Sequence, residues 1–493
     1  MKITNKKTYV CFVICLILIT FGVVHKTFEN DTFFTIATGN YIMENGVNDV
    51  EPFTIHDNLK FVKLRWAFDI VIANIYKFFG FSGIYLFVLI VSIGIAITLF
   101  TIFSKNKFNK IISLGIICLT MVFCSNYLRG RAQIISYLLF ILEFYFIEKL
   151  VKNNNKRDSI CLIVISYLIL CFHSSVWLVY FLLYIPYIVE HILVKLKVSK
   201  ILKLKKLVIE EHNIKLLLIT MGCAILTGFL TPLGLSPFTY MFKVMGGISK
   251  QIIVELQPLT LVGAVPLIVF GVLALISAIF PKTKIKIIDI FIIFGFTCMS
   301  IMAERNLYIG LFVMSFSYAR IITSFVNEYD KNKILDKIEN VINNSIIGKV
   351  IVIMLFLALT SITYSQIYKE QYVSEKSFPV QASEYIKENL DLSTLRMFTG
   401  FNFGSYVEFK GIPAFLDSRS EIYTREFNNV DILEDYANCA ILYTTSLDSV
   451  IEKYNLNYVL TYANKHYNMW SGKYKLVKEF DDGNFCLYKV EKY

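Results

Sequence analysis

Apolar runs of roughly 17–22 residues recur along this chain of 493 residues, and they constrain its fold more than any other feature. As a helix, a run of this length crosses a hydrocarbon core of about 30 Å. The strands of membrane barrels alternate apolar and polar residues, and these runs do not, so the sequence predicts a helical bundle. Hydrophobic residues form 56% of the chain and charged residues only 18%, which is typical of a polytopic membrane protein.

The lysines and arginines lie mainly in alternate loops between these runs. Three lysines precede the first run, at about residues 9–24, and no small-residue cleavage site follows it, so we expect an uncleaved helix with a cytoplasmic N-terminus. The basic loops at 104–110, 152–157 and 282–286 are then cytoplasmic. This pattern predicts about 11 spanning helices within residues 1–366, in the plasma membrane. It also explains the net charge of +11 without nucleic-acid binding.

Two segments between or after the spans have a different character. Residues 195–215 place lysines among Leu, Ile and Val, which predicts an amphipathic helix on anionic lipid. Residues 367–493 have no spanning run and are predicted to form a small extracytoplasmic α/β domain. Its expected helices are 380–389 and 446–455, and its expected strands are 399–409, 414–416, 458–461, 476–480 and 485–490, with Asp482-Gly483 as a hairpin turn.

The first outer loop, residues 26–65, is acidic and is the predicted catalytic loop. Asp31 follows the first span and precedes a predicted helix at 32–43. Its carboxylate can take a proton from an acceptor, hold a divalent ion, or simply cap that helix. Glu51 can join Asp31 in a metal site or contact the acceptor, although no pattern requires a metal.

Other charged residues are predicted at the same face of the membrane. Arg129 and Arg131 suit a phosphate or pyrophosphate, or they anchor a helix to lipid headgroups. His173, at the end of a span, binds phosphate or packs as a polar residue. Glu304 and Arg305 can pair with each other, or Arg305 can share an anion site with Arg131.

Glu255 lies in another predicted outer loop. We interpret it as a solvated side chain, with an acceptor or metal role as the alternative, and Glu304 has the same alternative role. In the tail, Asp417 and Arg419 are expected to pair structurally, rather than to bind the acceptor.

The chain resembles the GT-C glycosyltransferase superfamily, of the type that uses lipid-phosphate sugars. The first loop is similar to the family's opening, an Asp followed by Gly, Pro and Trp: Asp31, Gly39, Pro52 and Trp66. Arg129-Gly-Arg131-Ala-Gln133 resembles an Arg-Pro-Gln element, with Ala132 in place of Pro. Phe172-His173-Ser174 resembles an Asn-x-His-Gly element, from which Cys171 and Ser174 depart.

Three further elements continue the resemblance toward the C-terminus. Thr231-Pro232-Leu233-Gly234 is similar to an Asn-Pro-x-Gly turn. Asn402-Phe403-Gly404-Ser405-Tyr406 resembles a Gly-Gly-Tyr strand, and Phe415-Leu416-Asp417-Ser418-Arg419 resembles an Asp-Gly-Arg element. The matching pieces are therefore spread along nearly the whole chain.

The resemblance implies an inverting transfer of a sugar from a polyprenyl-phosphate donor to an extracytoplasmic glycan, lipid or protein. It implies that Asp31 is the base and that Arg129, Arg131 and either His173 or Arg305 hold the donor phosphate. Cations at the membrane surface can stabilise a phosphate leaving group, and a carboxylate on the opposite face of the sugar can activate the nucleophile.

Three other functions stay open. A polysaccharide polymerase or ligase acting on lipid-linked glycans would use the outer Arg and His residues without Asp31. A transporter would have polar or broken helices at mid-membrane and internal repeats, and the sequence offers few charges at span centres and no clear repeat. A scaffold would use the outer domain to bind a partner.

Overall fold

The computed structural model describes residues 6–197, 206–465 and 473–492, and the chain divides into two compact units. Unit 1 comprises Met1–His25, Tyr85–Phe238 and Glu255–Lys369. Unit 2 comprises Lys26–Ile84, Thr239–Val254 and Glu370–Tyr493. Three elements cross the boundaries between the units: α3 (Trp66–Lys105), α11 (Ser236–Gly246) and η5 (Val254–Leu256).

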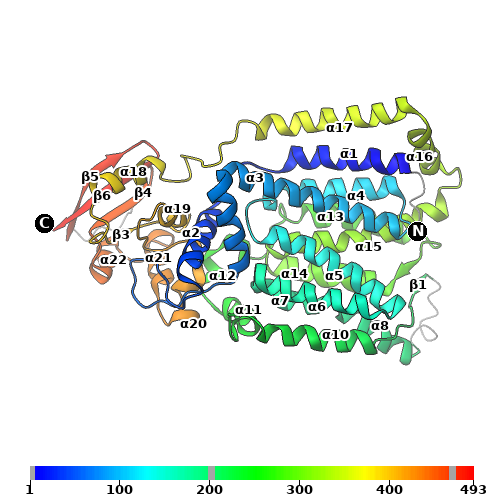
Figure 1. Ribbon diagram of the computed structural model, residues 1–493, viewed down its shortest axis with the longest axis horizontal. Helices are drawn as coiled ribbons and strands as arrows, with labels where there is room; N and C mark the ends of the chain where they lie inside the picture. Colours follow the sequence, from blue (N-terminus) through cyan, green and yellow to red (C-terminus); the bar gives the residue numbers. More distant parts are fainter. Residues whose placement is uncertain (1–5, 198–205, 466–472, 493) are drawn as a thin grey trace. The chain divides into compact units, whose positions relative to one another are not determined.

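Unit 1 is a bundle of helices that run alongside one another (Figure 1). Its helices are α1 (Lys6–Val23), α4 (Lys110–Phe123), α5 (Gln133–Asn153), α6 (Lys156–His173), α7 (Trp177–Tyr180), α8 (Ile185–Lys195), α10 (Lys215–Leu226), α13 (Val265–Ile279), α14 (Ile287–Met302), α15 (Asn306–Tyr329), α16 (Ile334–Asn344) and α17 (Ile346–Ile367). Short 3-10 turns interrupt them at η1 (Ser125–Tyr127), η2 (Ser174–Val176), η3 (Phe181–Leu183) and η4 (Thr227–Phe229). Helix α1 packs along α17, α5 along α6, and α14 along α15.

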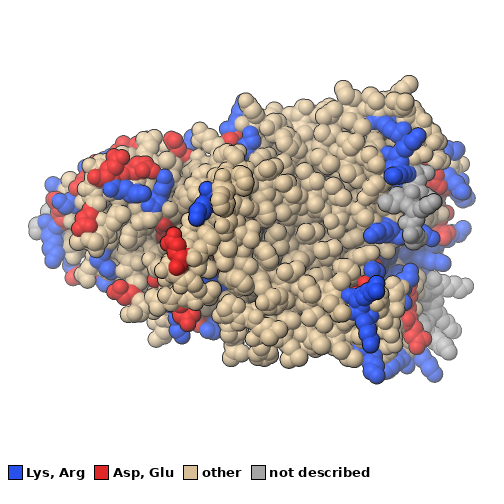
Figure 2. Space-filling model, viewed as in Figure 1, with Lys and Arg blue, Asp and Glu red and all other residues tan. Residues whose placement is uncertain are grey.

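The composition of these helices fits a membrane bundle. Within the described residues, five stretches are long and apolar enough to cross a membrane: Lys6–Val23, Trp66–Lys105, Lys156–Lys195, Asn306–Tyr329 and Ile346–Ile367. Shorter apolar helices accompany them at Lys110–Phe123, Lys215–Phe229, Val265–Ile279 and Ile287–Met302. Figure 2 shows a broad uncharged band over unit 1, with Lys and Arg side chains gathered at one end of it. The helical membrane bundle is confirmed, and the number of about 11 spans stays a prediction.

The prediction of a surface helix over residues 195–215 is wrong for the part of this range that the structure describes. Helix α8 ends at Lys195, and residues 198–205 lie outside the described residues. Beyond them the chain forms the short strand β1 (Leu207–Val208), which pairs in parallel with β2 (Ile285–Lys286). This pairing takes the backbone out of a helical conformation, because its hydrogen bonds go to another segment.

Unit 2 contains a four-stranded sheet with the strand order β3-β4-β6-β5. Its strands are β3 (Met397–Phe398), β4 (Tyr458–Tyr462), β5 (Tyr474–Asp481) and β6 (Phe485–Lys492). Strand β3 is parallel to β4, and the other neighbours are antiparallel. The predicted hairpin is confirmed: Gly483 adopts φ 83° at the turn, and its N–H donates to Oδ1 of Asp481 over 2.9 Å.

The helices of unit 2 lie around this sheet and within the first loop. They are α2 (Asn30–Asn45), α12 (Ser249–Ile252), α18 (Val380–Asn389), α19 (Gly404–Phe409), α20 (Arg425–Asn428), α21 (Ile432–Ala440) and α22 (Leu447–Tyr454), with the 3-10 turn η6 (Ser420–Tyr423). Helices α18 and α22 confirm the helices that the sequence predicts at 380–389 and 446–455.

Two predicted strands of the tail are wrong. Residues 404–409 form helix α19, and Ala414 makes only an isolated bridge with Thr54. A Cβ atom at Gly404 would lie 1.9 Å from the Leu416 carbonyl oxygen, so α19 packs directly against the segment that follows it. This tertiary contact outweighs the β-propensity of the Phe, Tyr and Val residues there.

The first loop and the tail share one hydrophobic core. Ile55 and Leu59 of the loop are buried with Phe415, Tyr423 and Val459 of the tail. The backbones also join, since the Ile55 N–H donates to the Ala414 carbonyl over 3.0 Å. Unit 2 therefore brings the acidic loop and the tail together, and it holds Asp31 against tail residues.

Candidate active site

Asp31 lies in the first turn of α2, where a carboxylate is favoured by the helix dipole. The alternative interpretation of Asp31 as the N-cap is wrong, because the N-cap position is Glu29, whose side chain makes no capping hydrogen bond. Helix α2 begins at Asn30, whose side-chain amide donates to the Phe401 carbonyl over 2.7 Å. The start of α2 is thus held by the tail.

Two side chains hold the Asp31 carboxylate within unit 2. Ser418 Oγ donates a hydrogen bond to Oδ1 over 2.8 Å, and Arg65 Nη1 lies 3.7 Å from Oδ2. The Asp31 side chain keeps 15% of its exposure, so it is neither sealed off nor freely solvated. Arg65 also lies over the Phe34 ring at 4.2 Å, which fixes the guanidinium beside Asp31. A carboxylate held in this way can accept a proton.

A buried arginine lies next to Ser418 in the chain and binds three carboxylates. Arg419 Nη1 and Nη2 bind the two oxygens of Glu51 at 3.0 and 3.1 Å. Arg419 Nε donates to Oδ1 and Oδ2 of Asp417 at 3.1 and 3.0 Å, and Nη2 donates to Oε2 of Glu408 at 3.0 Å. All four residues are buried. We call them the Arg419 cluster.

The charges of the Arg419 cluster do not balance if all three carboxylates are ionised. Burial, followed by the charge of Asp417, raises the pKa of Glu408 well above its ordinary value. Burial likewise raises the pKa of Glu51, against the opposing effect of Arg419. Burial alone would also raise the pKa of Asp417. The charge of the Arg419 guanidinium opposes burial, and the pKa of Asp417 is lowered. Of the three carboxyl groups, Glu408 is therefore the one whose protonated form the cluster favours most strongly.

The Arg419 cluster joins the first loop to the segment that carries Ser418. Glu51 belongs to the loop, and Asp417 and Arg419 flank Ser418 directly. Asp417 and Arg419 pair with each other, as the sequence predicts. Because the guanidinium binds all three carboxylates, the backbone at Ser418 is fixed relative to the loop. The cluster thus positions the hydroxyl that binds Asp31.

This arrangement does not suit a metal ion at Asp31 and Glu51. Both Glu51 oxygens accept hydrogen bonds from Arg419, and Asp31 binds Ser418 and Arg65. Among the residues that the structure describes, no group of three or more His, Cys, Asp or Glu side chains could hold a metal. The side chains at these two positions are committed to protein partners.

In unit 1, the structure brings Arg131, Glu255 and Arg305 together. Arg131 Nη1 donates to Oε1 of Glu255 over 2.7 Å, so the interpretation of Glu255 as a solvated side chain is wrong. The backbone of Glu255 also contacts the start of α15, since its carbonyl accepts the Arg305 N–H over 3.0 Å. Glu255 thereby links the two arginines, which lie at adjacent helix termini.

Glu304 and Arg305 do not pair with each other in the described part of unit 1. The Glu304 N–H donates to the Gln257 carbonyl over 3.1 Å. Within the described ranges, the Arg305 side chain has neither an ion pair nor a hydrogen bond. Arg305 therefore keeps the donors that an anion would need.

His173 is buried, with 4% of its surface exposed, at the end of α6. Its Nδ1 lies 2.7 Å from Ser136 Oγ of α5, which fits the packed polar residue among the two interpretations of the sequence. Arg129 lies in the turn before α5, where its carbonyl accepts the Arg131 N–H over 2.7 Å. Of the unit 1 residues, the arginines remain the candidates for phosphate.

Sequence reasoning missed three residues of the site: Arg65, Ser418 and Glu408. Arg65 directly precedes Trp66 of the family-like pattern, and Ser418 lies inside the Asp417-Ser418-Arg419 element, so both are next to residues that the resemblance names. Glu408 carried no sequence signal, because it lies in a segment with the residue pattern of a strand.

Comparisons with known proteins bear on the fold. No protein-family model and no curated protein matches the sequence. Among solved structures, an oligosaccharyltransferase of Archaeoglobus fulgidus, tethered to an acceptor peptide with an NVT sequon, matches with a TM-score of 0.59 and 13% identity over 93% of this chain and 69% of that chain. The same oligosaccharyltransferase in complex with Zn and sulfate matches with a TM-score of 0.51 and 11% identity, over 92% of this chain and 68% of that chain.

ArnT from Cupriavidus metallidurans, bound to undecaprenyl phosphate, matches with a TM-score of 0.54 and 12% identity over 98% of this chain and 97% of that chain. These proteins are GT-C glycosyltransferases. The chain therefore has the GT-C fold over nearly its whole length, as the sequence resemblance implies.

Proposed function

We propose that this protein is a membrane glycosyltransferase that moves a sugar from a polyprenyl-phosphate donor to an extracytoplasmic acceptor. The observation that carries the proposal is the match to ArnT bound to undecaprenyl phosphate, which covers 98% of this chain and 97% of ArnT. A fold shared over nearly the whole of both chains supports a donor of the kind that ArnT binds. The half-buried Asp31 carboxylate supplies the group that the chemistry needs.

In the proposed reaction, the bond between the anomeric carbon and the phosphate oxygen breaks. A bond forms from the acceptor oxygen or nitrogen to the same carbon, on the opposite face, so the configuration inverts. Asp31 takes the acceptor's proton, and the phosphate leaves on the lipid with its negative charge. Ser418 and Arg65 orient the Asp31 carboxylate for this step, a role that their contacts with it support.

We assign the donor phosphate to the arginines of unit 1. Within the described residues, the Arg305 guanidinium donates no hydrogen bond, so its N–H groups can bind a phosphate. Arg131 and Arg305 both contact Glu255, Arg131 through its side chain and Arg305 through its backbone N–H. Arg129, two residues from Arg131, is the third cation in this assignment. Guanidinium groups bind phosphate oxygens in pairs and stabilise the charge that develops on the leaving group. We do not assign His173 to the phosphate itself, because its Nδ1 contacts Ser136; its proposed role is to support the packing of α6 against α5.

The proposed location is the plasma membrane, with the N-terminus in the cytoplasm and residues 367–493 outside. The charge pattern supports this orientation, since Lys and Arg gather at one end of unit 1 in Figure 2. The acceptor is a glycan, lipid or protein of the cell envelope.

A deletion strain tests the proposed function. We expect the strain to lose one sugar from its envelope glycans, lipids or proteins, and to accumulate the matching polyprenyl-phosphate monosaccharide, both measured by mass spectrometry of extracts. Restoring the wild-type gene should reverse both changes. A strain with unchanged glycans and unchanged lipid-linked sugars would contradict the proposal.

A second candidate is the transfer of a whole lipid-linked glycan to an acceptor. The match to the Archaeoglobus fulgidus oligosaccharyltransferase, with a TM-score of 0.59, favours it. The same extracts distinguish the two, because an oligosaccharide on a polyprenyl carrier would then accumulate instead of a single sugar.

A further inference from the structure

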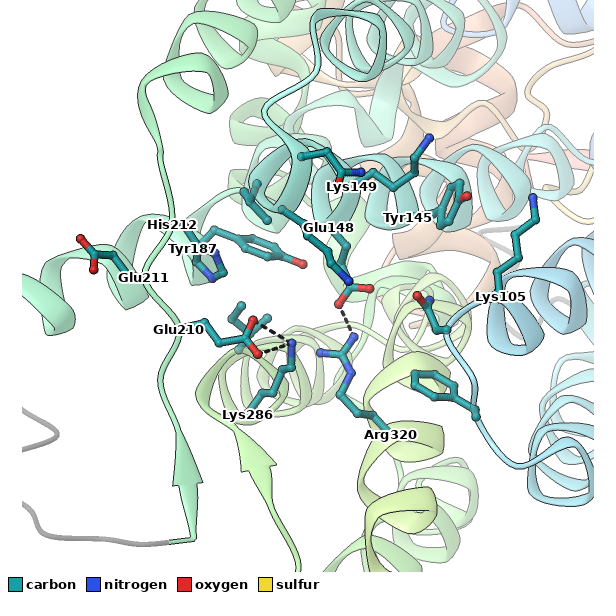
Figure 3. Close-up of a pocket in the computed structure, with 16 residues that line it drawn as sticks. Lys105, Tyr145, Glu148, Lys149, Tyr187, Glu210, Glu211, His212, Lys286 and Arg320 are labelled. Atoms are coloured by element: carbon teal, nitrogen blue, oxygen red, sulfur yellow. Dashed lines mark hydrogen bonds and ion pairs between the residues drawn. The ribbon is translucent and has the colours of Figure 1, made fainter. Parts of the chain in front are cut away.

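A cavity of about 830 Å³ lies within unit 1, and none of the residues assigned to the transfer reaction lines it. Its walls come from the end of α3, the second half of α5, α8, the segment 210–212, and α15 (Figure 3). The volume is in the range that proteins use for small ligands. It contains or borders many of the Lys and Arg residues that the sequence places at the cytoplasmic ends of the spans.

The walls of this cavity are fixed by buried ion pairs and hydrogen bonds. Arg320 of α15 pairs with Glu148 of α5, and its Nη1 lies 3.3 Å from Oδ1 of Asp289. On the opposite side, Glu190 of α8 lies 2.5 Å from Nε2 of His212. The first set of contacts ties α15 to α5 and α14, and the second ties α8 to the segment 210–212, so side chains of the protein itself hold the walls in place.

Most charges that line the cavity lie in ion pairs, and among the described residues Lys105, Lys152 and Glu211 do not. The Glu211 carboxylate points away from the other labelled side chains in Figure 3. Lys286 pairs with Glu210 at 2.8 Å, and Lys149 pairs with Asp158 at 2.9 Å. Among the described residues, Lys105 and Lys152 have no ion pair, although both line the cavity. Two exposed ammonium groups at the rim, each with free donors, favour an anion.

Inside the cavity, the buried Tyr187 hydroxyl has neither a hydrogen bond nor an ion pair within the described residues. Tyr187 of α8 is 1% exposed, and its hydroxyl makes no hydrogen bond to any residue that the structure describes. In Figure 3 its hydroxyl end points toward Glu148, into the space between the walls. A buried hydroxyl without a hydrogen bond is costly, and a bound oxygen atom would satisfy it.

We propose that this cavity binds a phosphate group, carried either by the headgroup of an anionic membrane lipid or by a soluble phosphate compound. Lys105 and Lys152 attract the phosphate oxygens at the rim, and the Tyr187 hydroxyl donates to an oxygen of the same ligand deeper in the cavity. The site is separate from the proposed transfer reaction and does not depend on it.

The test uses the full-length protein in detergent and two phosphate-bearing probes. One is a short-chain phosphatidylglycerol, with the short-chain diacylglycerol of the same tails as its uncharged control. The other is inorganic phosphate. Binding is followed by the ligand-dependent shift of the thermal unfolding midpoint and by native mass spectrometry. Binding of phosphatidylglycerol alone identifies a lipid headgroup, and binding of inorganic phosphate identifies a soluble ligand. Binding of neither probe overturns the proposal.

Variants locate the binding. The double variant Lys105→Ala/Lys152→Ala should weaken binding by about tenfold or more, because two charge-assisted contacts are lost. Its matched control is Lys282→Ala/Lys284→Ala, which removes two exposed lysines that do not line the cavity. An equal loss in the control would show attraction to surface charge in general, and would overturn the assignment to the cavity.

Tyr187→Phe removes one oxygen atom and leaves the ring in place. We expect about tenfold weaker binding, since a hydrogen bond to a charged ligand is lost. Without ligand, the variant should unfold at the same temperature as the wild type or higher, because a buried hydroxyl without a partner has been removed. Wild-type affinity in this variant would contradict the proposed contact.

Discussion

Ser418 donates a hydrogen bond to Oδ1 of Asp31 over 2.8 Å, across 387 positions of the sequence. The carboxylate belongs to the first loop and the hydroxyl to the tail, and both lie in unit 2. The Arg419 cluster fixes the backbone on both sides of Ser418 and includes Glu51 of the loop. The tail is therefore part of the candidate site, because it orients the proposed base.

Ser418→Ala removes this hydrogen bond. A hydrogen bond to a charged group contributes about 1.5–3 kcal/mol, so we expect the rate of sugar transfer in isolated membranes to fall by about tenfold or more. Ser418→Thr keeps a hydroxyl and should retain more activity than the alanine variant. The control is Ser393→Ala, which removes an exposed serine that donates to Asp391 over 2.7 Å. Transfer at the wild-type rate in Ser418→Ala would contradict the role of this contact.

Arg419→Met should destabilise unit 2, because it leaves three buried carboxylates without their cation. The expected cost is about 3–5 kcal/mol, as for other broken buried ion pairs. Hydrogen exchange followed by mass spectrometry should show faster exchange in peptides of the first loop and the tail. The matched control is Arg425→Met, because the Arg425 side chain is 67% exposed and pairs with Asp431 at the surface. Equal exchange in the two variants would show that the cluster does not hold the loop to the tail.

The partly buried His56 side chain should make the folded protein less stable in acid. Burial lowers its pKa to about 4, from an ordinary value of 6.5, and its Nε2 lies 2.8 Å from the Phe415 carbonyl oxygen. Between these two values the unfolded chain binds a proton that the folded chain does not bind. The free energy of unfolding therefore falls as pH drops from 6.5 toward 4, by about 3 kcal/mol in all.

His56→Gln should remove this dependence on pH, and hydrogen exchange of loop peptides between pH 4 and 6.5 measures it after correction for intrinsic exchange rates. Glu408 acts in the opposite direction, since its raised pKa makes stability fall as pH rises above 4.5. The comparison of wild type with His56→Gln isolates the histidine, because Glu408 is present in both. Identical pH profiles for the two proteins would contradict the prediction.

Gly39→Ala should displace the helix that carries Asp31. A Cβ atom there would lie 2.1 Å from the Asp69 carbonyl oxygen and 2.6 Å from the Ala73 Cβ, so α2 and α3 would have to separate. Overpacking of this kind costs about 1–3 kcal/mol and should also lower transfer activity. Gly94→Ala is the control, because a Cβ at Gly94 meets no atom within 4 Å. Thermal unfolding should show a lower midpoint only for Gly39→Ala, and equal midpoints would contradict the close packing.

Much of the fold follows from local sequence. The spans are predicted because a bilayer requires long apolar helices, and the hairpin β5–β6 because Asp482-Gly483 suits its turn. The pairing of Asp417 with Arg419 is also local, since two positions separate them. Helix α19 was missed because its residues favour a strand, and only the close approach of Gly404 to Leu416 selects the helix.

The candidate site depends on contacts that one sequence does not reveal. The place of Asp31 after the first span predicts its role, but its partner Ser418 is 387 positions away. The sequence suggests a metal or an acceptor for Glu51, whereas its partner in the structure is Arg419, 368 positions away. Which acidic residue meets which cation is decided by the packing of the loop on the tail, and that packing depends on the whole of unit 2.

The most direct test of the account compares Asp31→Asn with wild type in the deletion strain, at matched membrane levels. Asp57→Asn is the control, because Asp57 is an exposed aspartate of the same loop. Mass spectrometry of envelope sugars and of polyprenyl-phosphate sugars is the readout. We predict that wild type and Asp57→Asn restore the missing sugar, while Asp31→Asn does not and the donor accumulates. If Asp31→Asn restores the sugar as well as wild type does, Asp31 is not the base.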